Sequence, residues 1–120
     1  MSAIRATSSM LDRALYVALS RRLPGADLAP RLQAHLEFMI GLEERGILFA
    51  SGPFFGPDGS TSGAGMSIVR AGSLEEARAI LSADPFVVAG LRIFDLHEWH
   101  IMEGSLQLTV LASRQRGLLP

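Results

Sequence analysis

The chain has 120 residues, of which 48% are hydrophobic, and a formal net charge of −1. This length fits one compact domain, and the scattered arginines provide no basic face for nucleic acid. The lack of cysteine excludes disulfides, thiolate catalysis and cysteine-based metal sites. No apolar run reaches the roughly 20 residues that cross a bilayer, so we expect a cytoplasmic protein without membrane or nucleic-acid partners.

Residues 1–13 have neither the apolar block nor the cleavage site of a secretory signal. They are expected to form a flexible leader, within which Met10 is an alternative start. The single domain is predicted to cover residues 14–103. Its first strand spans residues 14–20, where side chains alternate as in a strand with one buried face. The residues that share one side are Leu15, Val17 and Leu19.

A helix is predicted from about Ala29 to Arg45, with Gly46 as its stop. Apolar residues recur there at steps of three and four, which indicates one buried face. These residues are Leu28, Leu32, Leu36, Met39 and Leu42.

The next strand, Ile47–Phe54, is apolar in both of its alternating sets, so we expect a central strand that is covered on both faces. Gly56–Gly65 is rich in glycine and contains Asp58-Gly59, which predicts a mobile hairpin connection. The third strand should then occupy Met66–Arg70.

The segment Ser73–Glu76 is a capping box, S-x-x-E, and predicts the start of a second helix. After that helix, Asp84-Pro85-Phe86 opens an apolar turn, and Arg92–Ile101 is predicted to be the fourth strand. The element order is therefore β-α-β-β-α-β, an α+β fold of ferredoxin-like type with its helices on one face of an antiparallel sheet.

The other face of this sheet needs a cover, because a chain this small and this apolar cannot bury all of its hydrophobic side chains. The sheet of a second copy of the chain could pack on this face, so we expect a homodimer. Residues 104–120 are predicted to be a C-terminal extension. It should contain a strand over Leu106–Leu111, at a sheet edge or exchanged across the dimer, and a frayed end over Gln115–Pro120.

His35 lies within the apolar stripe of the first helix and should face the sheet, where a polar ring needs a hydrogen-bond partner. A core histidine held by one hydrogen bond is one interpretation of this position, and a proton-transfer group is the other. Asp84 ends the second helix and is expected to cap the following turn with one oxygen. Its other oxygen would remain available for a second role.

The string His97-Glu98-Trp99-His100 does not match the H-E-x-x-H zinc motif. Its histidines are three residues apart on a predicted strand, so they point to opposite faces. We assign no metal site and expect no cofactor.

Two motifs of the chain are specific, the Gly-Pro after the second strand and the Asp-Pro-aromatic turn. They belong to a set of five segments, which are Ala34–Leu36, Glu44–Leu48, Ala50–Pro53, Ser73–Ala77 and Ala83–Leu91. Together these segments resemble the YCII-related family of small dimeric α/β-barrel proteins, and the resemblance covers most of the chain from Leu15 to Trp99. The chain departs from the family at Glu98-Trp99, where a Pro-aromatic pair is often found, and in its longer tail.

In that family a histidine of the first helix and the aspartate before the proline form the polar centre of a pocket. The resemblance thus implies a dyad of His35 and Asp84 and a lyase- or isomerase-type reaction on a small aromatic or lactone-like ring, such as a hydroquinone. The residues then expected to contact the substrate are Ser51, Gly52, Pro53, Phe54, Phe86 and Trp99. A non-catalytic ligand-binding or accessory module and a purely structural dimer are the alternatives.

Overall fold

The computed structural model describes residues 13–107, 109–111 and 116–118. The predicted leader, with Met10, therefore lies outside the described residues except for Arg13, which begins the first strand. The elements of the domain are β1 (Arg13–Arg22), η1 (Ala29–Arg31), α2 (Leu32–Glu44), β2 (Leu48–Phe55), β3 (Thr61–Val69), α3 (Leu74–Ser82), α4 (Pro85–Val88) and β4 (Arg92–Ile101). No helix in this described part has the length and hydropathy to span a bilayer.

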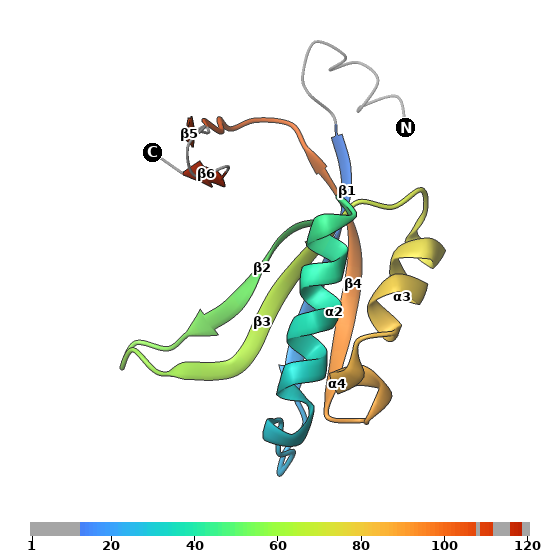
Figure 1. Cartoon of the computed structure of the whole chain (residues 1–120), viewed down its shortest axis with the longest axis vertical. Helices are drawn as coiled ribbons and strands as arrows, with labels where there is room; N and C mark the ends of the chain where they lie inside the picture. The colour runs from blue at the N-terminus through green and yellow to red at the C-terminus, as the bar shows by residue number, and fades with distance from the viewer. Residues whose placement is uncertain (1–12, 108, 112–115, 119–120) are drawn as a thin grey trace. The chain divides into compact units, whose positions relative to one another are not determined.

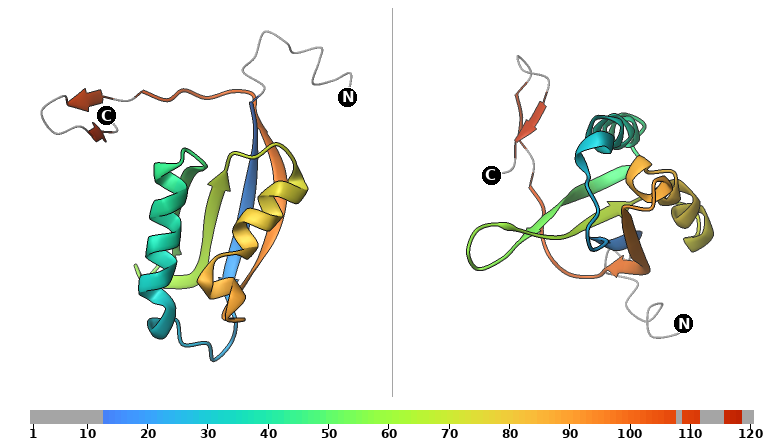
Figure 2. Two further views of the ribbon diagram at one scale, coloured as in Figure 1. Left: turned by 45° about the vertical axis from the view of Figure 1, so that its right-hand side comes forward. Right: turned by 90° about the horizontal axis from the view of Figure 1, so that it is seen from below.

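Four strands form one antiparallel sheet in the order β2-β3-β1-β4. The helices α2, α3 and α4 lie together on one face of this sheet, as the two turned views make clear (Figures 1 and 2). The predicted β-α-β-β-α-β order and the ferredoxin-like α+β fold are confirmed. The short helix α4 adds one turn between α3 and β4.

The core lies between the helices and the two inner strands. Tyr16 of β1 pairs with Val69 of β3, and both side chains are buried on the helix-facing side. Ala77 and Leu81 of α3 pack against them, because a helix that starts at Ser73 turns these two positions toward the sheet. The alternation along β1 thus determines which side chains meet the helices.

The predicted start of α3 is confirmed in atomic detail. Ser73 is extended, and its hydroxyl accepts a hydrogen bond from the N–H of Glu76 at 3.1 Å. The Glu76 carboxylate accepts from the N–H of Gly72 at 3.1 Å, so the N-terminal turn satisfies two backbone donors.

Two predictions about the hairpin are wrong. β2 lies at the edge of the sheet, not at its centre, and most of its side chains are exposed. β3 begins at Thr61 rather than Met66, because Gly63 and Gly65 join the strand although they carry no side chain for a pattern to detect.

The C-terminal extension contains a separate pair of short strands. β5 (Thr109–Leu111) pairs in antiparallel fashion with β6 (Arg116–Leu118). The strand expected over Leu106–Leu111 is therefore shorter, and part of the end that was expected to fray is its partner. The central Gly117 of β6 gives no alternation from which a strand could be predicted. The remainder of the predicted frayed end lies outside the described residues.

Candidate functional site

The site is built around His35, the fourth residue of α2. Its Nδ1 lies 2.9 Å from Oδ1 and 3.0 Å from Oδ2 of Asp84. The side chains are 22% and 14% exposed respectively, so the pair is largely shielded from solvent while remaining accessible. The two residues are 49 positions apart, and the packing of α2 beside α4 brings them together.

Asp84 is fixed by the backbone that follows it. Its Oδ1 accepts a hydrogen bond from the N–H of Phe86 at 2.9 Å, as the N-cap of α4, and Pro85 occupies the first helical position. One oxygen therefore serves both the cap and His35, while the second oxygen contacts His35 only. This geometry holds the carboxylate in a single orientation toward the ring.

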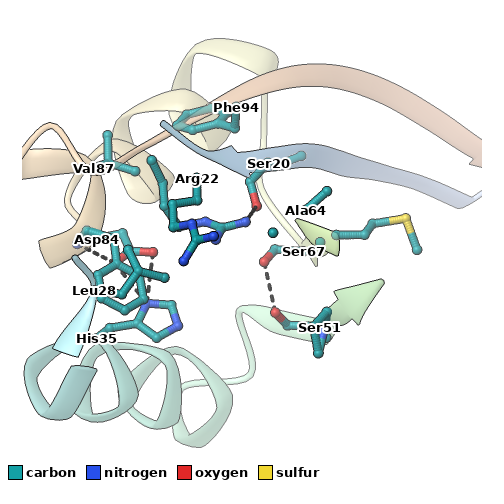
Figure 3. Close-up of a pocket in the computed structure, with 18 of the residues that line it drawn as sticks. Ser20, Arg22, Leu28, His35, Ser51, Ala64, Ser67, Asp84, Val87 and Phe94 are labelled. Carbon is teal, nitrogen blue, oxygen red and sulfur yellow. Dashed lines mark hydrogen bonds and ion pairs between the residues drawn. The ribbon is translucent and has the colours of Figure 1, made fainter. Parts of the chain in front are cut away.

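Phe86 fixes the plane of the His35 ring. The two rings stack with their centroids 4.2 Å apart and their planes 17° apart, and Phe86 is itself buried. Because Nδ1 is engaged by Asp84, the other ring nitrogen, Nε2, is the one turned toward the open cavity (Figure 3). A histidine held this way presents one defined atom to a ligand.

The cavity that His35 faces has a volume of about 470 Å³ and lies between α2, α4 and the helix-facing side of the sheet. On β2 and β3, the hydroxyls of Ser51 and Ser67 form a hydrogen bond of 2.9 Å at the far wall (Figure 3). The rest of the wall is mainly apolar and includes Leu28, Leu32, Leu36, Val87 and Phe94. A volume of this size and lining suits a small ring compound.

Arginine side chains form a further part of the wall. Arg22, at the end of β1, and Arg92, at the start of β4, both line the cavity. The Arg92 Nη2 donates a hydrogen bond to the Ser20 hydroxyl at 3.0 Å. Partial burial lowers the pKa of the Arg92 guanidinium, an effect that Asp84 opposes and Arg22 reinforces.

Sequence reasoning missed these three residues. Ser20 ends the predicted first strand and shares the period of Tyr16 and Ala18, and an alternation followed beyond residue 20 would have placed Arg22 on the same helix-facing side. Arg92 likewise shares its parity with Phe94 on the predicted fourth strand. For Arg22 the missing signal was the length of β1, because the predicted strand ended at residue 20.

The structure brings some of the predicted ligand-contacting residues together and not others. Ser51, Gly52, Pro53 and Phe86 line the cavity with the dyad. Phe54 instead lines a shallow hollow that includes Leu19 and Ile93. Trp99 does not line the cavity, because its parity on β4 is that of Ile93 and opposite to that of the cavity-lining Phe94.

Among the residues that the structure describes, no three histidine or acidic side chains gather in a way that could hold a metal ion. The polar groups that the cavity offers are thus a histidine–carboxylate pair, hydroxyls and guanidinium groups. Such groups can bind an oxygenated ring and exchange a proton with it.

The chain is similar in structure to 5-chloro-2-hydroxyhydroquinone dehydrochlorinase from Burkholderia phenoliruptrix AC1100, solved in complex with 2,5-dihydroxybenzoquinone. The two are 25% identical, the match covers 71% of this chain and 92% of that one, and the TM-score is 0.56. No curated protein matches the chain. The model of the YCII-related domain matches residues 14–100, which are the strands and helices around the cavity, and the chain therefore belongs to the YCII-related family.

Proposed function

We propose that this protein is a small enzyme of lyase or isomerase type in which His35 transfers a proton to or from a hydroxylated ring. The observation that carries the proposal is the contact of Nδ1 with both oxygens of Asp84, which leaves Nε2 directed at a cavity of suitable size. Membership of the YCII-related family and the likeness to a dehydrochlorinase support the same class of chemistry.

The proton transfer follows from the tautomer that Asp84 favours. When Nδ1–H donates to the carboxylate, the lone pair of neutral imidazole is on Nε2. Nε2 then takes the proton of a ring hydroxyl, and the electron pair of the broken O–H bond stays on the ring oxygen. In a lyase reaction the imidazolium returns this proton to the ring carbon that bears the leaving group, which makes that carbon tetrahedral. The leaving group then departs with its bonding pair while a second ring hydroxyl loses its proton, so the net loss is one proton and one anion.

Asp84 is a positioning residue in this scheme. Its negative charge stabilises the imidazolium that forms when Nε2 accepts the proton, and its fixed orientation keeps the ring aligned. Phe86 restrains the ring from the side by stacking. The Ser51 and Ser67 hydroxyls face the cavity from β2 and β3 and are suited to hydrogen-bond substrate oxygens.

We further propose that the protein acts as a homodimer that covers the sheet face directed away from the helices. The apolar side chains Leu19, Ile93 and Trp99 belong to this face and are 42%, 41% and 43% exposed. Large apolar groups exposed on one sheet face favour a partner surface. Elution as a stable monomer in size-exclusion chromatography at micromolar concentration would contradict the dimer without affecting the proposed chemistry.

The decisive experiment supplies 5-chloro-2-hydroxyhydroquinone and follows chloride release by ion chromatography. In parallel, 2,5-dihydroxybenzoquinone in D₂O is monitored by NMR for exchange of its ring protons. His35→Gln should abolish both signals, and His100→Gln should retain them because His100 lies outside the cavity and does not share the face of Ile93 and Trp99. Binding of these rings without chloride release or proton exchange would replace the enzyme with a ligand-binding module.

A further inference from the structure

The cavity contains more positive than negative charge. Its lining includes the guanidinium groups of Arg22 and Arg92, and Asp84 is the one acidic residue among the described residues that line it. Asp84 is already engaged by His35 and by the N–H of Phe86. Within the described part of the chain Asp84 is ion-paired with His35 and not with either arginine, although its charge acts on Arg92 at longer range. The two guanidinium groups therefore remain available to a ligand.

Arg92 has more hydrogen-bond donors than it uses. A guanidinium carries five N–H donors, and across the described part of the chain its side chain has one hydrogen bond, to the Ser20 hydroxyl. Partial burial also removes water from this group, which makes an unsatisfied charge costly and an incoming anion correspondingly favourable. The Ser20 hydroxyl uses one of these donors, and Arg92 lines the cavity with the others unpaired among the residues that the structure describes.

We propose that Arg92, assisted by Arg22, is the specificity-determining subsite for a negatively charged ring oxygen, so that the enzyme takes its ring substrate as the anion. This inference rests on the proposed function, since it names the substrate class of that same site. The planar guanidinium suits an oxyanion that is conjugated with a ring, because its N–H groups lie in one plane.

The chemistry of hydroxylated quinones agrees with this subsite. A hydroxyl group conjugated with a quinone carbonyl is a vinylogous carboxylic acid and is ionised at neutral pH. Guanidinium groups at the oxygen also stabilise negative charge that increases in the ring when a further proton is removed. The subsite and the base thus act on one ligand from different parts of the wall, Arg92 through β4 and His35 through α2.

The test compares binding of 2,5-dihydroxybenzoquinone, which is an anion at neutral pH, with binding of 2,5-dimethoxybenzoquinone, which is neutral. Calorimetry on the full chain measures both dissociation constants for wild type, Arg92→Gln, Arg92→Lys and Arg22→Gln. Arg78→Gln is the matched control, since Arg78 is exposed on α3 and outside the cavity. The thermal midpoint of each variant reports whether it is folded.

We expect Arg92→Gln to weaken binding of the anion by about tenfold or more and to leave the neutral ring unchanged within about twofold. Arg92→Lys should be intermediate, because it keeps the charge and loses the fork, and Arg78→Gln should match wild type. The inference is overturned if wild type binds both rings equally, if it binds neither, or if folded Arg92→Gln and Arg92→Lys both bind the anion normally.

Failure of the proposed function gives a different pattern. If the anion binds in an Arg92-dependent manner and no ring proton exchanges, the subsite stands and the enzyme proposal falls. If proton exchange depends on His35 but binding ignores Arg92, the enzyme proposal stands and the anionic substrate class falls.

Discussion

Asp84 contacts Nδ1 of His35 with both carboxylate oxygens, at 2.9 and 3.0 Å, while its Oδ1 also caps α4. Asp84 thus has two roles, as a charge beside His35 and as the N-cap of α4, and we expect Asp84→Asn and Asp84→Ala to separate them. Asp84→Asn keeps a good N-cap and loses the charge, so the thermal midpoint should change little while turnover falls by about 10²-fold. Steady-state kinetics and thermal unfolding measure the two effects. Normal turnover in Asp84→Asn would rule out a role for the negative charge.

The second substitution, Asp84→Ala, removes the cap as well. The N–H of Phe86 then lacks its acceptor, and the fold should lose about 1 kcal/mol beyond any change seen with Asp84→Asn. Urea unfolding of both variants measures this difference. Equal stabilities would show that the cap contributes nothing to the fold.

The capping hydroxyl of Ser73 provides a prediction that is independent of the site. Ser73→Ala removes the acceptor for the N–H of Glu76 and should lower the free energy of unfolding by about 1 kcal/mol. Ser82→Ala, an exposed position in the last turn of α3, is the control and should change it by less than about 0.5 kcal/mol. Turnover at saturating substrate should be unaffected by either variant.

Gly65 is expected to tolerate no side chain. A Cβ at this position would lie 2.9 Å from the carbonyl oxygen of Gly52 and 3.3 Å from Cα of Pro53, so β2 and β3 would have to separate. We expect Gly65→Ala to cost about 1–3 kcal/mol of stability. Gly41 of α2 has open space around it, and Gly41→Ala should instead stabilise the fold by about 0.4–1 kcal/mol. Chemical denaturation that shows equal effects at the two positions would contradict this assignment.

Tyr16 predicts a loss of stability in alkali. Burial raises the pKa of Tyr16 above its ordinary value of 10.0, and the Glu98 carboxylate adds to this shift. The unfolded chain therefore loses this proton at lower pH than the folded chain. The contribution is fully present below pH 10 and is lost as the pH rises through the folded pKa.

Absorbance at 295 nm reports this titration directly, because Tyr16 is the chain's one tyrosine. The sequence also has no lysine to titrate in the same range. Tyr16→Phe should show a flatter dependence of unfolding free energy on pH between about 9 and 11. A tyrosine that titrates at its ordinary pKa in the folded protein would contradict the prediction.

The sequence allowed the dyad to be predicted because each partner carries a local signal. His35 interrupts an apolar stripe of known period, and Asp84 precedes a proline that begins a new turn. The distance between them could not be derived from either signal, since it depends on how α2 packs beside α4. The family resemblance supplied that pairing, and the structure has the geometry that the pairing needs.

The parts that could not be predicted depend on neighbours rather than on local pattern. Ser51, Gly52 and Pro53 of β2 line the cavity although this strand lies at the sheet edge and is mostly exposed, so its position at the edge is not visible in its composition. Arg22 and Arg92 are charged residues at strand ends, where solvent exposure is the ordinary expectation. Only the fold shows that both of them line one cavity.

The shared oxygen of Asp84 also links the proposed catalysis to the local fold. The histidine comes from the first β-α unit and the aspartate from the second, and α4 starts on the same atom that orients the imidazole. Local unfolding of this four-residue helix would release the carboxylate while leaving the sheet intact. Turnover should therefore decline on heating before the global transition, which would make the enzymatic rate a sensitive reporter of local unfolding at α4.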